Sequence, residues 1–187
     1  MRSAGAEGAR EQGGTRDRIT LAGTVVAMEE IERLVLESLE GLGASYEMIR
    51  IDPDLADTAA FCGHYGYALE ESANAILVAS RKPEGRHALC LALATTRLDV
   101  NHAVRDLLAV RKLSFASPEV TKEVTGMEIG GVTPFGAPED LPILVDARIP
   151  VLKRCIVGGG GRAMKVLVDP EVFTRMHGVR VVEGLAG

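Results

Sequence analysis

Residues 75–94 read AILVASRKPEGRHALCLALA, and this stretch decides the class of fold. The apolar runs Ala75–Ala79 and Ala88–Ala94 each have the length of a strand, and a charged segment containing Pro83 and Gly85 separates them. Short apolar runs on either side of such a turn are typical of a β-hairpin. We therefore predict a buried pair of antiparallel strands here.

Helical and strand patterns flank this hairpin on both sides. Apolar residues at helical spacing from Ile31 to Leu42 predict an amphipathic helix that Gly41 and Gly43 end. Further helices are expected after Asp54 or Asp57, Asp99, Ser117 and Asp169, and further strands over 46–51, 112–116, 143–145, 155–157, 164–168 and 179–182. Strands outnumber those of a regular strand–helix alternation, so we expect a mixed α/β domain with a largely antiparallel sheet.

Length and composition fit one globular domain with an N-terminal tail. The 187 residues are 47% hydrophobic and 25% charged, which is the balance of an ordinary folded domain. Residues 1–26 are rich in Gly, Ala, Arg and Glu and show no apolar period. We therefore predict a disordered extension over 1–26 and a single domain over 27–187.

The charge balance argues against several classes of partner. The 21 Lys and Arg against 26 Asp and Glu give a net charge of −5, unlike a basic protein that coats DNA or a polybasic membrane binder. From this charge balance we expect neither DNA nor a membrane surface as a partner. A membrane span is not expected either, because no apolar run approaches the ~18 residues that it needs. Cys62, Cys90 and Cys155 lie far apart, which suits a reducing compartment, and the predicted location is cytoplasmic.

Familiar catalytic signatures are missing from the sequence. The glycines 158–161 follow a predicted strand, but another strand comes next, whereas a phosphate loop needs a helix there. A tight turn explains most of these glycines better. No Gly-x-Ser-x-Gly elbow occurs, and Cys62 and His64, two apart on a predicted helix, point in different directions. We predict no metal and no cofactor.

A turn alone does not explain the segment GMEIGGVTPFG, residues 126–136. It combines a helix stop with the pair Gly130-Gly131, and Val132 and Phe135 are expected to anchor it in the core. Paired glycines let backbone N–H groups approach a ligand closely, which is one way to hold negative charge on a carbonyl oxygen. This segment is therefore the first candidate for a functional site.

The loop from Gly130 to Gly136 resembles the Gly-x-x-x-Pro loop of the YbaK family, which includes the editing insertion domain of bacterial prolyl-tRNA synthetase. The resemblance extends in order from Met28 to Gly184. It includes the helix start Thr58-Ala59-Ala60, the strands Asn74–Val78 and Leu89–Thr96, Asp146 after Ile143–Val145, the Gly158-Gly159 turn and the helix start Asp169-Pro170.

This resemblance implies a fold and an activity. The fold would be a mixed α/β domain around a curved, barrel-like, largely antiparallel sheet surrounded by helices. The activity would be hydrolysis, in trans, of the ester of a mischarged aminoacyl-tRNA, such as alanyl- or cysteinyl-tRNA for proline, with no metal. The partners would be the 3′ acceptor end of the aminoacyl-tRNA and a tRNA synthetase.

The resemblance also assigns roles to individual residues. Backbone groups of Gly130 and Gly131, with Asn74, would form the catalytic site. The substrate-binding residues would be Thr58, Thr133, Pro134, Gly136, Asp146, Gly158 and Gly159. For Asp146, a structural cap on the following turn is an equally good interpretation from the residues alone.

One position departs from the family pattern. The family usually has a lysine at the start of the first core strand, where this chain has Asn74. An amide can donate and accept hydrogen bonds but carries no charge. In one alternative, another cation supplies the charge, from Arg81, Arg86, Arg97 or Lys112. In the other, the chain is a non-catalytic module that binds tRNA ends, a nucleotide or a partner protein.

Overall fold

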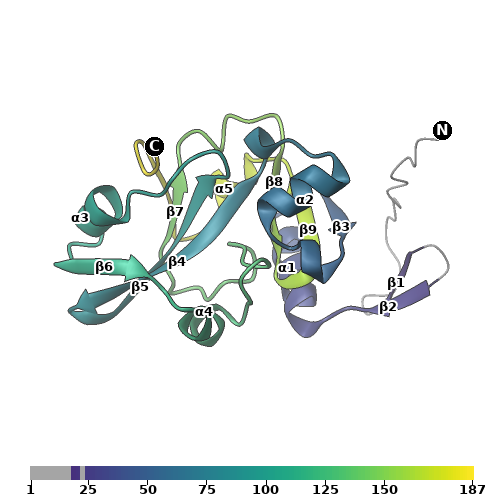
Figure 1. Ribbon diagram of the computed structural model, residues 1–187, viewed down its shortest axis with the longest axis horizontal. Coiled ribbons are helices and arrows are strands. Elements are labelled where there is room, and N and C mark those ends of the chain that lie inside the picture. Colours follow the sequence, from purple (N-terminus) through teal and green to yellow (C-terminus); the bar gives the residue numbers. More distant parts are fainter. Residues whose placement is uncertain (1–17, 22–23) are drawn as a thin grey trace.

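The predicted hairpin is present and lies within the larger of the sheets (Figure 1). The structure is a computed structural model that describes residues 18–21 and 24–187. Strand β4 (Ala73–Lys82) pairs antiparallel with β5 (Glu84–Leu93). Both strands are longer than the apolar runs that predicted them, because their charged ends continue the pairing toward the turn.

The other elements follow the order that the patterns predict. The remaining strands are β1 (Arg18–Leu21), β2 (Thr24–Ala27), β3 (Tyr46–Arg50), β6 (Lys112–Phe115), β7 (Ile143–Asp146), β8 (Cys155–Gly159), β9 (Gly161–Val168) and β10 (Val179–Val182). The α-helices are α1 (Glu30–Gly41), α2 (Thr58–Tyr65), α3 (Arg105–Leu107), α4 (Pro118–Thr125) and α5 (Val172–Arg175). Short 3-10 turns are η1 (Pro53–Leu55) and η2 (Leu69–Glu71), and η3 (Val100–Val104) is a π-helical turn.

The strands form open sheets. A five-stranded sheet has the order β10-β7-β5-β4-β6, in which β7 runs parallel to both of its neighbours and the other pairs are antiparallel. A three-stranded antiparallel sheet has the order β3-β9-β8. A bridge between Ser72 and Ile156 joins the two where β4 begins. The mixed, largely antiparallel α/β fold is confirmed, but the curved sheet does not close into a barrel.

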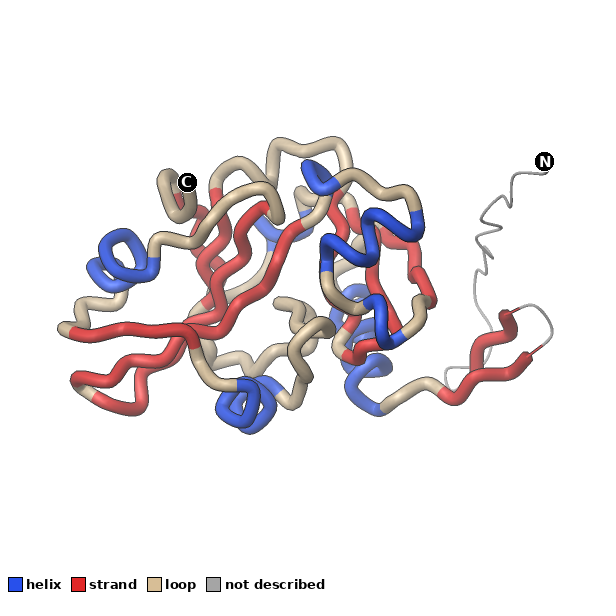
Figure 2. Tube along the Cα trace, viewed as in Figure 1, coloured by secondary structure: helices blue, strands red, loops and turns tan. Residues whose placement is uncertain are grey.

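The two faces of the five-stranded sheet pack against different layers. Side chains alternate along each strand, so Leu77 and Leu89 join a core shared with the three-stranded sheet. Val78 and Cys90 point to the opposite face and pack with Val104 of η3. Figure 2 shows the long loop between α4 and β7, which contains the glycine pair, crossing toward the smaller sheet.

Several predicted helix ends are confirmed in detail. The Asp57 carboxylate accepts hydrogen bonds from the first backbone amides of α2, and Gly66 ends that helix in the left-handed conformation. Ser117 caps α4, and Gly126 ends it in the same way. Helix α1 is tied to β3 by a buried ion pair, in which Arg50 Nη1 lies 2.7 Å from Glu32 Oε2.

The N-terminal region differs in part from the expectation. Strands β1 and β2 pair with each other within the stretch 1–26 and one residue beyond it, where we expected no regular structure. Their residues are largely β-branched, which favours strands, but each run is too short to show a period. Residues 1–17 and 22–23 lie outside the described residues, and the domain boundary stays a prediction. In the described part of the chain, no helix has both the length and the apolar character needed to cross a membrane.

Candidate active site

A small pocket lies where the two sheets meet. Its volume is about 50 Å³. Helix α2, strand β4, the glycine loop, β8 and β9 all contribute to its wall, through Thr58, Ala73, Asn74, Ala75, Gly130, Val132, Gly158 and Lys165. Four of the residues that the sequence predicted for the site, Thr58, Asn74, Gly130 and Gly158, therefore come together here although they are far apart in the chain.

The side chains of Thr58 and Asn74 form one polar pair of the pocket. Asp57 caps α2 and so places Thr58 at the first helical position, directly opposite the start of β4. Thr58 Oγ1 donates a hydrogen bond of 2.6 Å to Asn74 Oδ1. Because the oxygen of this amide is occupied, the Asn74 side chain presents its N–H groups as donors to a ligand.

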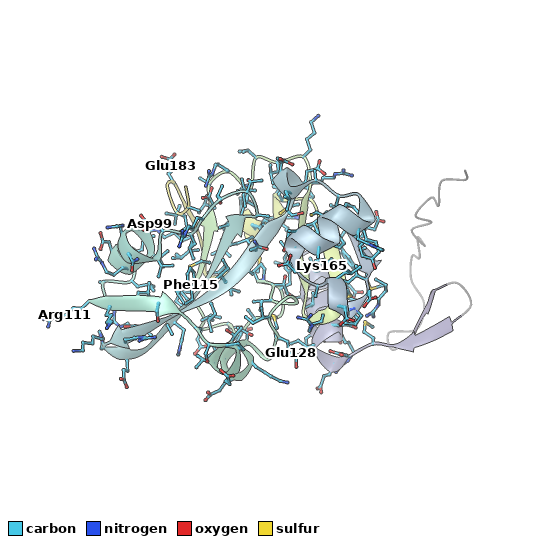
Figure 3. The ribbon with its side chains drawn as sticks, in the orientation of Figure 1. Asp99, Arg111, Phe115, Glu128, Lys165 and Glu183 are labelled. Carbon is cyan, nitrogen blue, oxygen red and sulfur yellow. The ribbon has the colours of Figure 1, made fainter. Side chains whose placement is uncertain are left out.

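Lys165 contributes a buried cation that the sequence analysis missed. The residue is only 4% exposed. Its Nζ donates to the carbonyl oxygens of Ala56 at 2.8 Å and Gly130 at 2.9 Å, and lies 5.8 Å from the centre of the Phe61 ring. An ammonium group has three N–H donors, so one remains for a ligand in the pocket (Figure 3 labels Lys165).

The pKa of Lys165 reflects this burial. Desolvation by burial is the main cause; together with the positive charge of Arg162 it outweighs the opposing negative charge of Asp57 and lowers the pKa of Lys165 to about 8. The amine is therefore mostly protonated at neutral pH, yet it can lose its proton within a range where enzymes work.

Close contact between backbones explains the two glycine runs. The Gly160 N–H donates to the Gly131 carbonyl at 2.8 Å. A Cβ atom on Gly131 would lie 2.6 Å from the Gly160 carbonyl oxygen, and one on Gly158 would collide with the carbonyl oxygens of Val132 and Gly131. The Gly131 N–H itself donates to the Glu128 carbonyl at 2.9 Å. Both runs are thus needed to let the loop lie directly on the β8–β9 turn.

Several predicted site residues lie outside the wall of this pocket. Thr133 and Pro134 are buried, and the Thr133 hydroxyl has no hydrogen-bond partner among the described residues. Gly136 has a φ of +71° and faces the backbone of α1, and a Cβ on Gly159 would contact Met164. As expected, Phe135 anchors the loop, with its ring stacked on Phe173 at 5.5 Å.

Asp146 lies away from the pocket and holds the C-terminal segment in place. Its carboxylate pairs with Arg148 at 2.8 Å and accepts from the Ala186 amide at 3.2 Å, while Arg148 also donates to the Ala186 carbonyl. Burial tends to raise the pKa of Asp146, but the hydrogen bonds and charge of Arg148 and the Ala186 amide together lower it. Of the two interpretations of Asp146, these contacts favour the structural one.

Replacing Asp146 with asparagine should therefore lower the free energy of unfolding by about 1–3 kcal/mol at pH 7, because Arg148 loses its charged partner. A carboxylate with a lowered pKa stabilises the fold above its ordinary pKa and loses that effect as pH falls through the folded value. Urea unfolding at pH 7 and at pH 3 checks this. The gap between wild type and variant should shrink at pH 3, and an equal gap at both would contradict it.

The cations considered from sequence lie elsewhere. Arg81 donates to Ser114, Arg86 donates to the Leu108 carbonyl, and Arg97 lines a different hollow. Lys112 begins β6 and is not part of the pocket wall. The sequence contained one indication that Lys165 is unusual, because it is a lone charge within the apolar strand Met164–Val168. It did not indicate which groups the Lys165 side chain would contact. Across 18–21 and 24–187, no three His, Cys, Asp or Glu side chains are grouped to hold a metal ion.

Comparison with known proteins gives both a family and a fold. The model of the aminoacyl-tRNA editing domain family matches residues 52–176. The crystal structure of a candidate trans-editing enzyme for prolyl-tRNA synthetase superimposes with a TM-score of 0.70 at 21% identity, covering 84% of this chain and 98% of that one. The hypothetical protein APE2540 gives 0.72 at 21% identity, with 82% and 99% covered.

These likenesses agree with the resemblance to the YbaK family that the glycine loop indicated. At such identities, the solved structures establish the shared fold, and the family match spans most of the domain, including the pocket. The chain belongs to the aminoacyl-tRNA editing domain family.

Proposed function

We propose that this protein is an aminoacyl-tRNA deacylase that acts in trans on the ester of a mischarged tRNA. The observation that carries the proposal is the pocket in which the Asn74 amide and the Lys165 ammonium group both have donors to offer. Membership of the editing-domain family supports an ester of tRNA as the substrate.

The chemistry needs a water molecule and a place for negative charge. Water adds to the ester carbonyl, the bond from that carbon to the ribose oxygen breaks, and the products are the free amino acid and the tRNA with its 3′-terminal hydroxyl restored. Donors that face the carbonyl oxygen stabilise the charge that develops on it. The Gly131 N–H is already bonded to Glu128, so in this proposal Asn74 and Lys165 are those donors and the Gly130 loop shapes the wall.

Pocket size supports a small aminoacyl group. The pocket has a volume of about 50 Å³, where roughly 10–15 Å³ of cavity volume is enough to hold one water molecule. A methyl or thiol-bearing side chain is of this scale, whereas a large apolar or aromatic one is not. Alanyl- or cysteinyl-tRNA for proline is the substrate we propose, in line with the prolyl-tRNA synthetase association of a structurally similar protein. We propose that the synthetase is the protein partner and that the protein is located in the cytoplasm.

A panel of charged tRNAs tests the proposal. Purified full-length protein is incubated with tRNAs that carry matched and mismatched amino acids, and release of the amino acid is followed over time. Multiple turnovers on a mischarged tRNA with a small residue are expected. Binding without any loss of ester would instead favour the non-catalytic module that Asn74 suggested, and release of bulky residues only would contradict the substrate size.

The absence of a lysine at position 74 has a testable consequence. Because Lys165 already brings a cation to the pocket, Asn74→Lys alone should give no gain in kcat/KM, since a second ammonium group repels the first. In the Lys165→Met background, the same change should recover about tenfold of the lost activity, the equivalent of one charge-assisted hydrogen bond. Steady-state deacylation by the three variants measures this. A gain from Asn74→Lys alone would mean that the wild-type pocket lacks its charge.

A further inference from the structure

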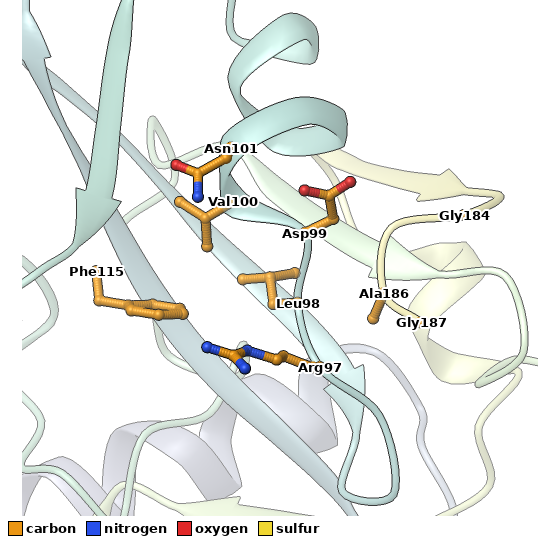
Figure 4. A pocket seen from close by; sticks show the side chains of 9 residues that line it. All are labelled: Arg97, Leu98, Asp99, Val100, Asn101, Phe115, Gly184, Ala186 and Gly187. Carbon is orange, nitrogen blue, oxygen red and sulfur yellow. The ribbon is translucent and has the colours of Figure 1, made fainter.

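A second hollow, larger than the first, opens beside the edge of the five-stranded sheet (Figure 4). Its volume is about 480 Å³. Arg97, Asp99 and Asn101, from the segment that leads into η3, and Phe115 at the end of β6 line it. A volume of this size falls in the range of sites for small organic ligands.

The exposure of Phe115 is unusual for this chain, in which aromatic residues are only 4% of the sequence. Phe115 is 52% exposed, whereas Phe61, Phe135 and Phe173 are fully buried. Figure 4 shows the ring of Phe115 and the guanidinium group of Arg97 lining the same hollow. An exposed aromatic face and a cation on one surface are the groups with which proteins stack a nucleobase and hold its phosphate.

The polar groups around the ring differ in whether other residues already occupy them. The Asp99 carboxylate is occupied by the backbone and ring nitrogens of His102, both at 3.1 Å. The Arg97 side chain forms no ion pair with any residue that the structure describes. Only the backbone of Arg97 is engaged, in hydrogen bonds with the backbone of Gly187. Arg97 and the side-chain amide of Asn101 are therefore the groups that face a ligand.

Strand register relates this hollow to the active-site pocket. Phe115 lies opposite Val78 in the β4–β6 pair. Side chains four apart on a strand share a face, so Asn74 lies on the same face of β4 as Val78, about 13 Å along the strand. Stacked nucleotides advance by about 3.4 Å each, and the nucleotides of an extended single strand of RNA are spaced further apart. The Phe115 ring is thus within about four nucleotides of Asn74.

We propose that the Phe115–Arg97 hollow binds a nucleobase of the unpaired 3′ strand of the tRNA, a few positions before the terminal adenosine whose ester enters the active-site pocket. This rests on the proposed function, because it makes the tRNA end the ligand. Phe115 stacks on the base, and Arg97 contacts the adjoining phosphate.

Binding of uncharged RNA tests the proposal without depending on turnover. A fluorescent RNA that ends in an unpaired CCA strand is titrated with full-length protein. Phe115→Leu should weaken binding by about 5- to 100-fold, the range for loss of one base–aromatic stack, and Phe115→Trp should retain it. Arg97→Gln should weaken binding and reduce its salt dependence by about one phosphate contact. Val151→Ala, a change at another exposed apolar residue, is the control and should bind like wild type.

A kinetic comparison locates the effect on the RNA. The ratio of kcat/KM for a charged tRNA to that for the corresponding aminoacyl-adenosine ester should fall in Phe115→Leu, because only the tRNA reaches the hollow. Equal RNA binding by Phe115→Leu, Phe115→Trp and wild type would overturn the proposal, as would a wild type that binds a free mononucleotide as tightly as the CCA strand. RNA binding that depends on Phe115, in a protein that hydrolyses no ester, would leave the subsite standing and overturn the proposed function alone.

Discussion

Replacing Lys165 with methionine should lower kcat/KM for deacylation by about 10²- to 10³-fold, the usual effect of removing one donor that holds a developing oxyanion. Methionine has nearly the length of lysine and no charge, so it fills the same space beside Phe61. The Ala56 and Gly130 carbonyls lose their donor in this variant. Measured rates therefore need a check by circular dichroism that the protein remains folded.

The pH dependence separates the charge of Lys165 from its bulk. Burial lowers the pKa of Lys165 to about 8, so the ratio of wild-type to Lys165→Met activity should fall as pH rises through that value. Lys165→Arg keeps a charge at every accessible pH, and its activity relative to Lys165→Met should not change over the same range. A wild-type advantage over Lys165→Met that is constant from pH 6 to pH 10 would contradict a role for the charge.

Stability should respond to pH in the opposite direction. The unfolded chain binds a proton at Lys165 up to its ordinary pKa of about 10.4, whereas the folded protein releases it at about 8. Between these values the unfolded state holds more protons, so the free energy of unfolding rises with pH. Relative to Lys165→Met, the wild type should therefore gain stability from pH 8 to pH 10, while it loses its catalytic advantage. Urea unfolding of both proteins measures this.

Adding a methyl group at Gly158 should destabilise the protein by about 3 kcal/mol or more, at the upper end of the effects of overpacking. The new Cβ atom would meet the carbonyl oxygens of Val132 and Gly131, which are backbone atoms that cannot rotate away. The loop would have to lift from β8, and the hydrogen bond from Gly160 to Gly131 would break. Gly158→Ala should therefore lose activity as well as stability.

A matched control is available in helix α2. Gly63 has no heavy atom within 4 Å of the position of a Cβ, and it lies inside the helix. Gly63→Ala should raise the free energy of unfolding by about 0.5–1 kcal/mol, since alanine loses less backbone entropy in a helix. Thermal unfolding of both variants gives the comparison. A Gly158→Ala protein as stable as Gly63→Ala would mean that the two glycine runs are not in contact.

Much of the architecture could be predicted from local patterns. The two apolar runs around Pro83 gave the central hairpin, and Gly66 and Gly126 ended the helices in the left-handed conformation that favours glycine. Such features depend on residues close in the chain. The number of sheets did not follow from them, because strands 46–50 and 161–168 could have joined either sheet.

The candidate site was predicted only in part, for a related reason. Thr58, Asn74, Gly130 and Gly158 were found through the resemblance and line the pocket. Lys165 was missed because its partners are the Ala56 and Gly130 carbonyls, and a sequence does not indicate which carbonyl groups a lysine will reach. Asp146 was assigned to the site because of its position in the family pattern, whereas its contacts are with Arg148 and the C-terminal segment.

The central claim is that this pocket holds the acylated end of a tRNA with its carbonyl oxygen between Asn74 and Lys165. A crystal structure of the full-length protein with a stable amide analogue of 3′-alanyl-adenosine tests it most directly. We expect the carbonyl oxygen to lie within about 3.2 Å of both Asn74 Nδ2 and Lys165 Nζ, with the methyl group toward Gly130 and Gly158. An analogue bound with its carbonyl away from Lys165, or bound in another part of the molecule, would contradict the account.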